Sequence, residues 1–201
     1  QGDASTIWYA QDGEAPVAFH VTDGLRADAP ACVNALGKLD LSIEMLSGDR
    51  EAPAAEAARQ AGITVWHAAN TPTQKSDHLN VLKENGHRVL MIGDGLNDAA
   101  ALSVAHVSIS PGTAVQASQT AADFILQGES LMPVVEAVEV ARRAHNLVLQ
   151  NFALSALYNV CAVPLAAMGM VTPLIAAIAM SGSSLLVMLN ALRLARFDRT
   201  A

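Results

Sequence analysis

Two apolar stretches near the carboxyl end, residues 147–171 and 174–192, constrain the fold of this 201-residue chain more than any other feature. Each reaches the roughly 20 residues that a helix needs to cross a bilayer, and the second contains no charged residue. The link between them, around residues 170–173, is short enough to predict a tight helical hairpin. The alternative is a pair of buried helices in a soluble protein.

Charge divides the chain in the same place as hydropathy. Residues 1–140 hold 7 Lys and Arg against 18 Asp and Glu, a balance of −11. Residues 141–201 hold 5 against 1, a balance of +4, and the two balances sum to the −7 of the whole chain. An acidic amino-terminal part argues against nucleic acid as a partner, because the phosphate backbone requires clustered Lys and Arg.

Arginines flank the hairpin only at its open end. The positive-inside rule therefore predicts that both ends of the hairpin lie in the cytoplasm and that its tip lies outside, with membrane lipid around the two helices. Buried helices of a soluble protein would not need this charge pattern. The flanking residues are Arg142, Arg143, Arg193, Arg196 and Arg199.

Short apolar runs alternate with helical patterns between residues 23 and 126, which predicts an α/β fold with a doubly wound parallel sheet. Before them, an Asp-Gly turn predicts an antiparallel hairpin of residues 7–10 and 17–20. The strands are expected at 41–46, 63–67, 89–92, 107–110 and 124–126, and the helices at 29–39, 53–62, 74–85, 98–105 and 114–121.

Three polar motifs follow strands of this predicted sheet. They are residues 47–49 (Ser-Gly-Asp), residues 71–75 (Thr-Pro-Thr-Gln-Lys) and residues 93–98 (Gly-Asp-Gly-Leu-Asn-Asp). In a doubly wound sheet the ligand binds at the carboxyl ends of the strands. The three motifs are therefore expected to meet at one edge of the sheet.

The third motif suits Mg²⁺. Asp94 and Asp98 lie four residues apart, so a helix that opens at this turn brings both carboxylates to one point. Mg²⁺ prefers one or two carboxylates together with water and phosphate oxygens. One alternative is a dinucleotide fingerprint, but Asp98 stands where that fingerprint has Gly or Ala, and it would repel a bare pyrophosphate. A purely structural Asp-Gly turn is the other.

The same edge carries the parts that phosphoryl transfer needs. Ser47 can donate a hydrogen bond to a phosphoryl oxygen, Lys75 can offset its charge, and a metal ion can neutralise the charge that develops in the transition state. None of these groups is an evident nucleophile.

In this order and spacing, the three motifs resemble those of the phosphorylation domain of P-type ATPases, a haloacid-dehalogenase-like fold. In that family ATP phosphorylates an aspartate in an Asp-Lys-Thr-Gly motif, which these 201 residues do not contain. The chain is therefore expected to be a carboxyl-terminal fragment, inactive alone, whose nucleophile lies upstream. The resemblance implies that Asp94 and Asp98 hold Mg²⁺ and assigns the catalytic groups to Ser47, Gly48, Asp49, Lys75 and Asn97.

The resemblance also implies a domain plan. Residues 1–22 would end the inserted nucleotide-binding domain, 23–132 would form the phosphorylation domain, 133–146 a linking helix, and 147–201 two transmembrane helices with a short tail. The whole protein would be a multi-pass protein of the bacterial inner membrane, with its phosphorylation domain in the cytoplasm. A membrane-anchored phosphatase of the same fold is the alternative.

Polar side chains inside the hairpin indicate which ion is transported, because such groups are costly in a membrane and usually functional. The first stretch holds Tyr158 and Asn159, and the second holds Met180 and Ser184 on one helix face. A thioether beside oxygen and amide ligands favours a soft ion such as Cu(I). The two pairs resemble signatures of copper-transporting ATPases, which implies an upstream Cys-Pro-Cys and delivery by a copper chaperone; another heavy metal is the alternative.

Residues 106–112 and 180–194 resemble the subgroup associated with copper supply to cbb3-type cytochrome oxidases. Cys32 and Cys161 are too far apart in the sequence to indicate a disulfide or a Cys-x-x-Cys metal module. The histidines at positions 67, 78 and 106 show no metal-ligand spacing and are predicted to be surface or packing residues.

Overall fold

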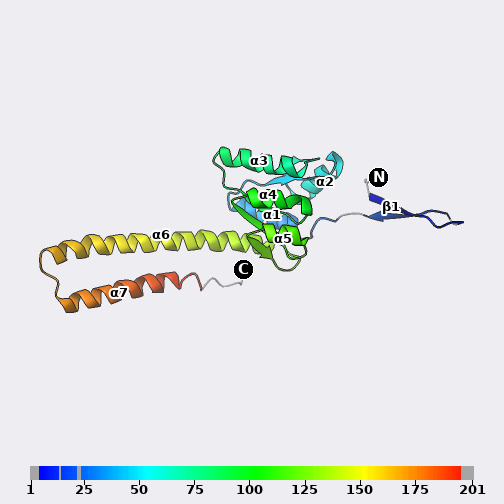
Figure 1. The fold of residues 1–201 in the computed structure, drawn as a ribbon. Coiled ribbons are helices and arrows are strands. Elements are labelled where there is room, and N and C mark those ends of the chain that lie inside the picture. The colour runs from blue at the N-terminus through cyan, green and yellow to red at the C-terminus, as the bar shows by residue number, and fades with distance from the viewer. Residues whose placement is uncertain (1–4, 14, 22–23, 196–201) are drawn as a thin grey trace. The chain divides into compact units, whose positions relative to one another are not determined.

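A computed structural model describes residues 5–13, 15–21 and 24–195 of the chain (Figure 1). The chain divides into two compact units, Gln1–Val135 and Glu136–Ala201. The expected boundary at residues 22 and 23 and the arginines at positions 196 and 199 lie outside the described residues.

An antiparallel hairpin begins the first unit, as predicted. Strands β1 (Ser5–Tyr9) and β2 (Val17–Val21) pair with Tyr9 opposite Val17. Gly13 in the connection has φ +88°, a conformation that side chains other than glycine rarely adopt. The Asp-Gly turn therefore forms where the sequence indicates it.

Helices and strands then alternate, which confirms the predicted α/β organisation. A short 3₁₀ helix, η1 (Leu96–Asp98), precedes α4 and was not expected. The helices are α1 (Ala29–Lys38), α2 (Glu51–Ala61), α3 (Pro72–Glu84), α4 (Ala99–Val104) and α5 (Gln116–Ala121). The strands are β3 (Glu44–Leu46), β4 (Val65–His67), β5 (Leu90–Ile92), β6 (Val107–Pro111) and β7 (Phe124–Leu126).

All of these strands run parallel, but they form two separate ladders. β3 pairs with β4, and the other ladder has the order β5-β6-β7. Within the described residues no ladder joins β3 to β5. Each ladder nevertheless ends in predicted motifs, because β3, β4 and β5 lead directly into them.

Small side chains allow α2 to pack closely. Ala54, Ala58 and Ala61 recur at helical spacing and are all buried. Gly62 then ends the helix in a left-handed conformation, φ +76°, and its N–H donates to the carbonyl of Arg59. This is the glycine C-cap that the sequence predicts.

Asp28, just before α1, caps a helix that starts about a hundred residues later. Its Oδ2 accepts hydrogen bonds from Ser130 Oγ at 2.6 Å, from the Leu131 N–H at 2.6 Å and from the Met132 N–H at 3.3 Å. Met132 is the first residue of α6 (Met132–Ala167). The hydrogen bond from Ser130, followed by those from the two backbone N–H groups, lowers the pKa of Asp28 below its ordinary value.

Asp28→Asn should lower the free energy of unfolding of the first unit by about 1 kcal/mol at neutral pH, because asparagine keeps an oxygen acceptor for the cap but its hydrogen bonds lose the assistance of the carboxylate charge. Because the folded pKa is lowered, this stabilisation is complete above the unfolded pKa and disappears as the pH falls through the folded value. Chemical unfolding of the whole chain in detergent at pH 7 and near pH 3 measures the difference. The gap between variant and wild type should narrow at the lower pH, while the control Asp77→Asn should change neither value.

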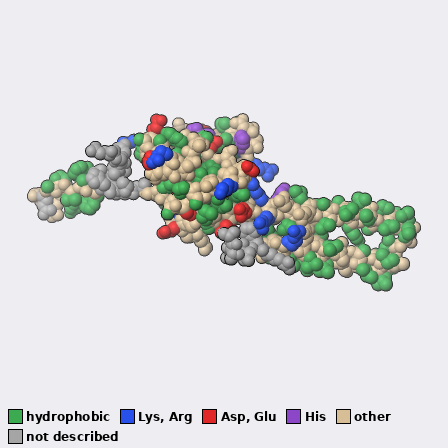
Figure 2. Space-filling view, turned by 180° about the vertical axis from the view of Figure 1, so that it is seen from behind, with side chains coloured by type: hydrophobic (Ala, Val, Ile, Leu, Met, Phe, Trp, Pro, Cys, Tyr) green, Lys and Arg blue, Asp and Glu red, His purple; other side chains and the backbone are tan. Residues whose placement is uncertain are grey.

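Two long helices make up the second unit. α6 continues from Met132 to Ala167, so the segment predicted as a linking helix and the first apolar stretch form one helix. α7 (Pro173–Ala191) follows a short turn in which Gly169 has φ +74°. By length and composition each helix could cross a membrane, and exposed apolar side chains predominate on α7 and on α6 from Val148 onward (Figure 2).

A polar contact ties the two helices together near their open end. Asn190 Nδ2 on α7 donates to Asn151 Oδ1 on α6 at 2.9 Å, and Arg193 donates to Asn190 Oδ1 at 3.1 Å. The turn joins the helices at the other end. These two connections fix how residues of α6 and α7 stand opposite one another.

Candidate functional site

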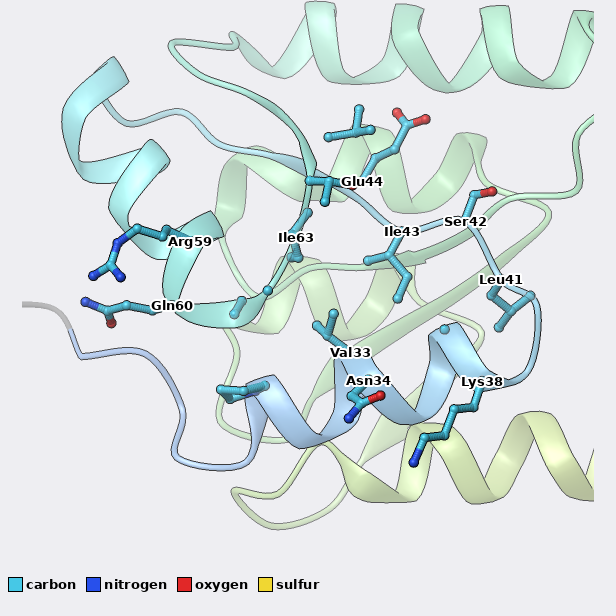
Figure 3. A pocket seen from close by; sticks show the side chains of 16 residues that line it. Val33, Asn34, Lys38, Leu41, Ser42, Ile43, Glu44, Arg59, Gln60 and Ile63 are labelled. Carbon is cyan, nitrogen blue, oxygen red and sulfur yellow. The ribbon is translucent and has the colours of Figure 1, made fainter.

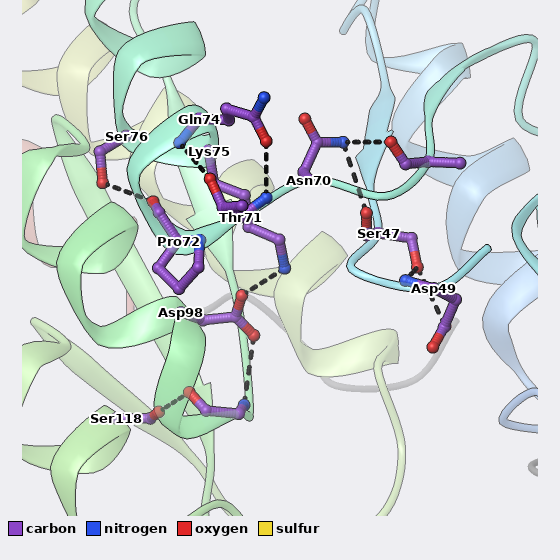
Figure 4. A network of polar contacts seen from close by, with 12 residues as sticks. Ser47, Asp49, Asn70, Thr71, Pro72, Gln74, Lys75, Ser76, Asp98 and Ser118 are labelled. Atoms are coloured by element: carbon purple, nitrogen blue, oxygen red, sulfur yellow. Dashed lines mark hydrogen bonds and ion pairs between the residues drawn. The ribbon is translucent and has the colours of Figure 1, made fainter. Parts of the chain in front are cut away.

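The centre of the candidate catalytic site is an ion pair between two of the predicted motifs. Lys75 Nζ on α3 lies 2.7 Å from Asp98 Oδ1 on η1, and the two side chains are only 9% and 13% exposed (Figure 4). A buried pair of this kind is strongly destabilising to break. The structure therefore brings together the lysine that follows β4 and the carboxylate that follows β5.

The start of α3 is built so that Lys75 occupies this place. Thr71 and Gln74 form a capping box: Thr71 Oγ1 accepts from the Gln74 N–H at 3.3 Å, and Gln74 Oε1 accepts from the Thr71 N–H at 2.8 Å. Pro72 occupies the first turn, where it suits a helix start. The Thr-x-x-Gln signal was present in the sequence, but the predicted helix began at residue 74.

The glycine-rich turn holds Asp98 from the other side. Asp98 Oδ2 accepts a hydrogen bond from the Gly95 N–H at 3.2 Å. A Cβ atom on Gly93 would lie 2.7 Å from Asp98 Cβ, so only glycine fits there. Ser118 on α5, which is fully buried, donates to the Gly95 carbonyl. No local sequence signal indicated Ser118, because it lies 23 residues from Gly95.

Two reciprocal hydrogen bonds join Ser47 to Asp49. Ser47 Oγ donates to Asp49 Oδ2 at 3.0 Å and accepts from the Asp49 N–H at 3.0 Å. Asn70, just before Thr71, donates its N–H to the Ser47 carbonyl at 2.9 Å and its Nδ2 at 3.4 Å. Asn70, which was not predicted, thus joins the loop after β3 to the motif after β4.

Gly48 lies between Ser47 and Asp49. A Cβ there would make only an ordinary contact, at 3.5 Å, with the Asn70 carbonyl.

Asp94 and Asn97 face solvent on the same turn. Their side chains make no hydrogen bond or ion pair with any residue that the structure describes. An exposed carboxylate beside the partly buried carboxylate of Asp98 is an oxygen donor set that suits Mg²⁺. The residues therefore fit the ion, although Asp98 would have to share its carboxylate with Lys75, and the Mg²⁺ assignment stays a prediction.

One cavity lies away from these motifs. It measures about 840 Å³ and lies between α1 and the residues that lead into β3 and β4, including Val33, Leu41, Ile43 and Ile63 (Figure 3). Val33 lies on α1, and the other three residues precede β3 and β4 at the amino-terminal ends of these strands. Since ligands of doubly wound sheets bind at the carboxyl ends, we assign no catalytic role to this cavity.

The four predicted copper ligands lie within about 6 Å of one another along the hairpin, with Met180 about 15 Å from the Asn151–Asn190 contact and the other three about 9–12 Å from it. Seven residues beyond Asn151 on α6 is Tyr158, and seven residues before Asn190 on α7 is Ser183. At the usual helical rise, both lie about 10 Å from the Asn151–Asn190 contact. Tyr158 and Asn159 therefore stand level with the segment that contains Met180 and Ser184. No hydrogen bond joins these four side chains to one another in the described part of the hairpin.

Comparison with known proteins places the chain in a family. The family model for haloacid dehalogenase-like hydrolases matches residues 1–106. The nitrogen fixation protein FixI of Bradyrhizobium diazoefficiens is 49% identical over 196 residues, which are 98% of this chain and 27% of that protein. The probable copper-exporting P-type ATPase V of Mycobacterium tuberculosis is 36% identical over 195 residues, 97% of this chain and 25% of that protein.

Solved structures give the same result. The crystal structure of a zinc-transporting PIB-type ATPase in its E2.Pi state matches with a TM-score of 0.83 and 30% identity, over 89% of this chain and 29% of that one. The chain spans about a quarter of the length of these curated relatives. It belongs to the haloacid dehalogenase-like hydrolase family, and its relatives along nearly the whole chain include P-type ATPases.

Proposed function

We propose that this chain is the carboxyl-terminal part of a P-type ATPase that moves Cu(I) across a bacterial inner membrane. The observation that carries the proposal is the buried Lys75–Asp98 ion pair, which joins two phosphoryl-transfer motifs in a chain that also ends in an apolar hairpin. A phosphatase would need the Lys75–Asp98 ion pair but not the apolar hairpin.

The catalytic groups have distinct tasks in this proposal. Lys75 offsets the charge of a phosphoryl group, and Asp98 holds Lys75 in place. Ser47 presents its hydroxyl at the end of β3, where a phosphoryl oxygen would compete with Asp49 for the proton. Mg²⁺ held by Asp94 and Asp98 would neutralise charge on the phosphoryl oxygens. The nucleophile is an aspartate that these 201 residues do not contain, and ATP is bound by a domain upstream.

The proposed ion depends on Met180. Relatives differ here, since one is named as copper-exporting and one solved structure is of a zinc transporter. A thioether is a soft ligand that suits Cu(I) better than zinc. Met180 is 70% exposed on the hairpin, so its side chain is not taken up by packing between α6 and α7. Similarity to proteins named FixI supports a further part of the proposal, in which the copper serves assembly of a cbb3-type oxidase.

Met180→Ala in the complete transporter tests the function and the ion together. Wild type should form an acid-stable phosphoenzyme from ATP and Mg²⁺ and should hydrolyse ATP faster when Cu(I) is added. Met180→Ala should reduce the Cu(I)-stimulated rate by about tenfold or more, because one soft ligand is lost. Radiolabelled phosphate incorporation and ATP turnover at a series of Cu(I) concentrations measure both.

Met188→Ala is the matched control, since Met188 lies two turns further along α7 and outside the proposed ligand set. Unchanged copper dependence in Met180→Ala, or stimulation of wild type by Zn²⁺ in place of Cu(I), would refute the ion assignment. A wild-type protein that forms no phosphoenzyme would refute the ATPase itself.

A further inference from the structure

Two histidines and a glutamate that are far apart in the sequence meet on the surface of the first unit. Glu44 begins β3, His67 ends β4, and His78 lies in the middle of α3. One ligand atom from each lies within 4.8 Å of the others. His78 Nε2 is 2.7 Å from Glu44 Oε2, and the rings of His67 and His78 have centroids 4.8 Å apart at 54°.

The fold explains why these three side chains converge. Leu46 stands opposite His67 in the parallel ladder, and Glu44 lies two residues before Leu46. Side chains two apart along a strand share a face, so Glu44 and His67 point to the same side. α3 follows β4 and brings His78 to that side. None of these relations could be read from sequence spacing.

We propose that Glu44, His67 and His78 form a binding site for a divalent transition-metal ion of the zinc class. Two imidazole nitrogens and one carboxylate oxygen are a donor set that zinc-class ions favour and that Mg²⁺ does not. Such sites commonly hold three protein ligands and leave the fourth position to water. The side chains of His78 and Glu44 are 28% and 29% exposed, so a hydrated ion can reach them.

The distances require only a small adjustment. Tetrahedral zinc with bonds of about 2.0–2.1 Å places its ligand atoms about 3.3 Å apart. The His78–Glu44 contact would open slightly from 2.7 Å, and His67 would move inward from the 4.8 Å limit. Rotation of surface side chains about their own torsions achieves both without moving the backbone.

A bound ion would fasten α3 to the β3–β4 pair. This matters because α3 carries Lys75, while Ser47 and Asn70 follow β3 and β4. The ion would therefore brace three groups of the catalytic edge from the side, without contacting any of them. The site is distinct from the hairpin and from the Asp94 turn, and it does not depend on the proposed function.

The test is titration of the whole chain, purified in detergent, with Zn²⁺ and separately with Co²⁺, whose visible absorption reports coordination by histidine. One high-affinity equivalent is expected, and His67→Ala should weaken it at least about 100-fold, more than the usual effect of losing only an outer hydrogen bond. His67→Ala is preferred because none of the described hydrogen bonds or ion pairs uses the His67 side chain. His87→Ala, an exposed histidine elsewhere, is the control and should bind as wild type does.

Glu44→Gln is the second variant, to be used if circular dichroism shows that His67→Ala is misfolded. Glutamine keeps a hydrogen-bond acceptor for His78 but removes the anionic ligand. It should weaken Zn²⁺ binding while the unfolding temperature of the metal-free chain stays close to that of wild type. The proposal is overturned if wild type binds no stoichiometric Zn²⁺, or if folded His67→Ala or Glu44→Gln binds it as tightly as His87→Ala. In that case the cluster is only an ion pair beside a ring contact.

Discussion

Asp94→Asn in the complete transporter is expected to reduce Mg²⁺-dependent phosphoenzyme formation by about 100- to 1,000-fold, the range typical of removing one group that stabilises charge in a transition state. The free energy of unfolding should stay within about 0.5 kcal/mol of wild type. The reason is structural: Asp94 is exposed and its side chain has no partner among the described residues. Its carboxylate can therefore serve a ligand without serving the fold.

Rapid-quench phosphorylation with labelled ATP, together with chemical unfolding, measures both quantities. Asp98→Asn is the informative comparison, because Asp98 pairs with buried Lys75 and its loss should reduce activity and stability together. If Asp94→Asn formed normal levels of phosphoenzyme, Asp94 would not belong to the Mg²⁺ site. If it unfolded as easily as Asp98→Asn, its role would be structural.

Lys75→Met should destabilise the first unit by about 3 kcal/mol and abolish phosphorylation. Methionine fills similar space but leaves the Asp98 carboxylate, which is 13% exposed, without its cation. Breaking a buried pair by removing one partner typically costs about 3–5 kcal/mol. Denaturant unfolding of the whole chain in detergent measures the change, and Lys38→Met, on the exposed side of α1, should stay within about 0.5 kcal/mol of wild type.

The double variant Lys75→Met with Asp98→Asn separates stability from chemistry. Because no uncompensated charge remains, it should recover at least about 1 kcal/mol of the stability lost in Lys75→Met. It should not recover activity, since the cation that faces the phosphoryl group is still missing. Strictly additive losses in the two single variants and the double variant would show that the ion pair is not coupled in the way the geometry indicates.

Local signals in the sequence predicted most elements of the fold. The Asp-Gly turn of the first hairpin, the glycine cap after α2 and the two apolar helices all depend on residues close together in the chain, and all are confirmed. Pairing between elements was harder. Periodicity identified the parallel strands but not their division into two ladders, because a strand's pattern records which face is buried and not which strand lies beside it.

The same limit applies to the candidate site. The motifs of Lys75 and Asp98 could be predicted, since each follows a strand, but their direct ion pair could not. Ser118, Asn70 and the His67–His78 contact were missed because they depend on side chains that meet through the fold. The roles of Ser47, Gly48, Asp49 and Asn97 in catalysis stay predictions, as does the whole domain plan.

The double attachment of the hairpin, through the Asn151–Asn190 contact and the turn around Gly169, determines which changes the two helices can tolerate. Inserting or deleting one residue rotates everything beyond it on that helix by about 100° and shifts it by about 1.5 Å. Between Asn151 and Tyr158, such a change would turn Tyr158 away from the face of α6 that it shares with Asn151, or break the Asn151–Asn190 contact. Substitutions along α6 should thus be accepted far more readily than changes of its length.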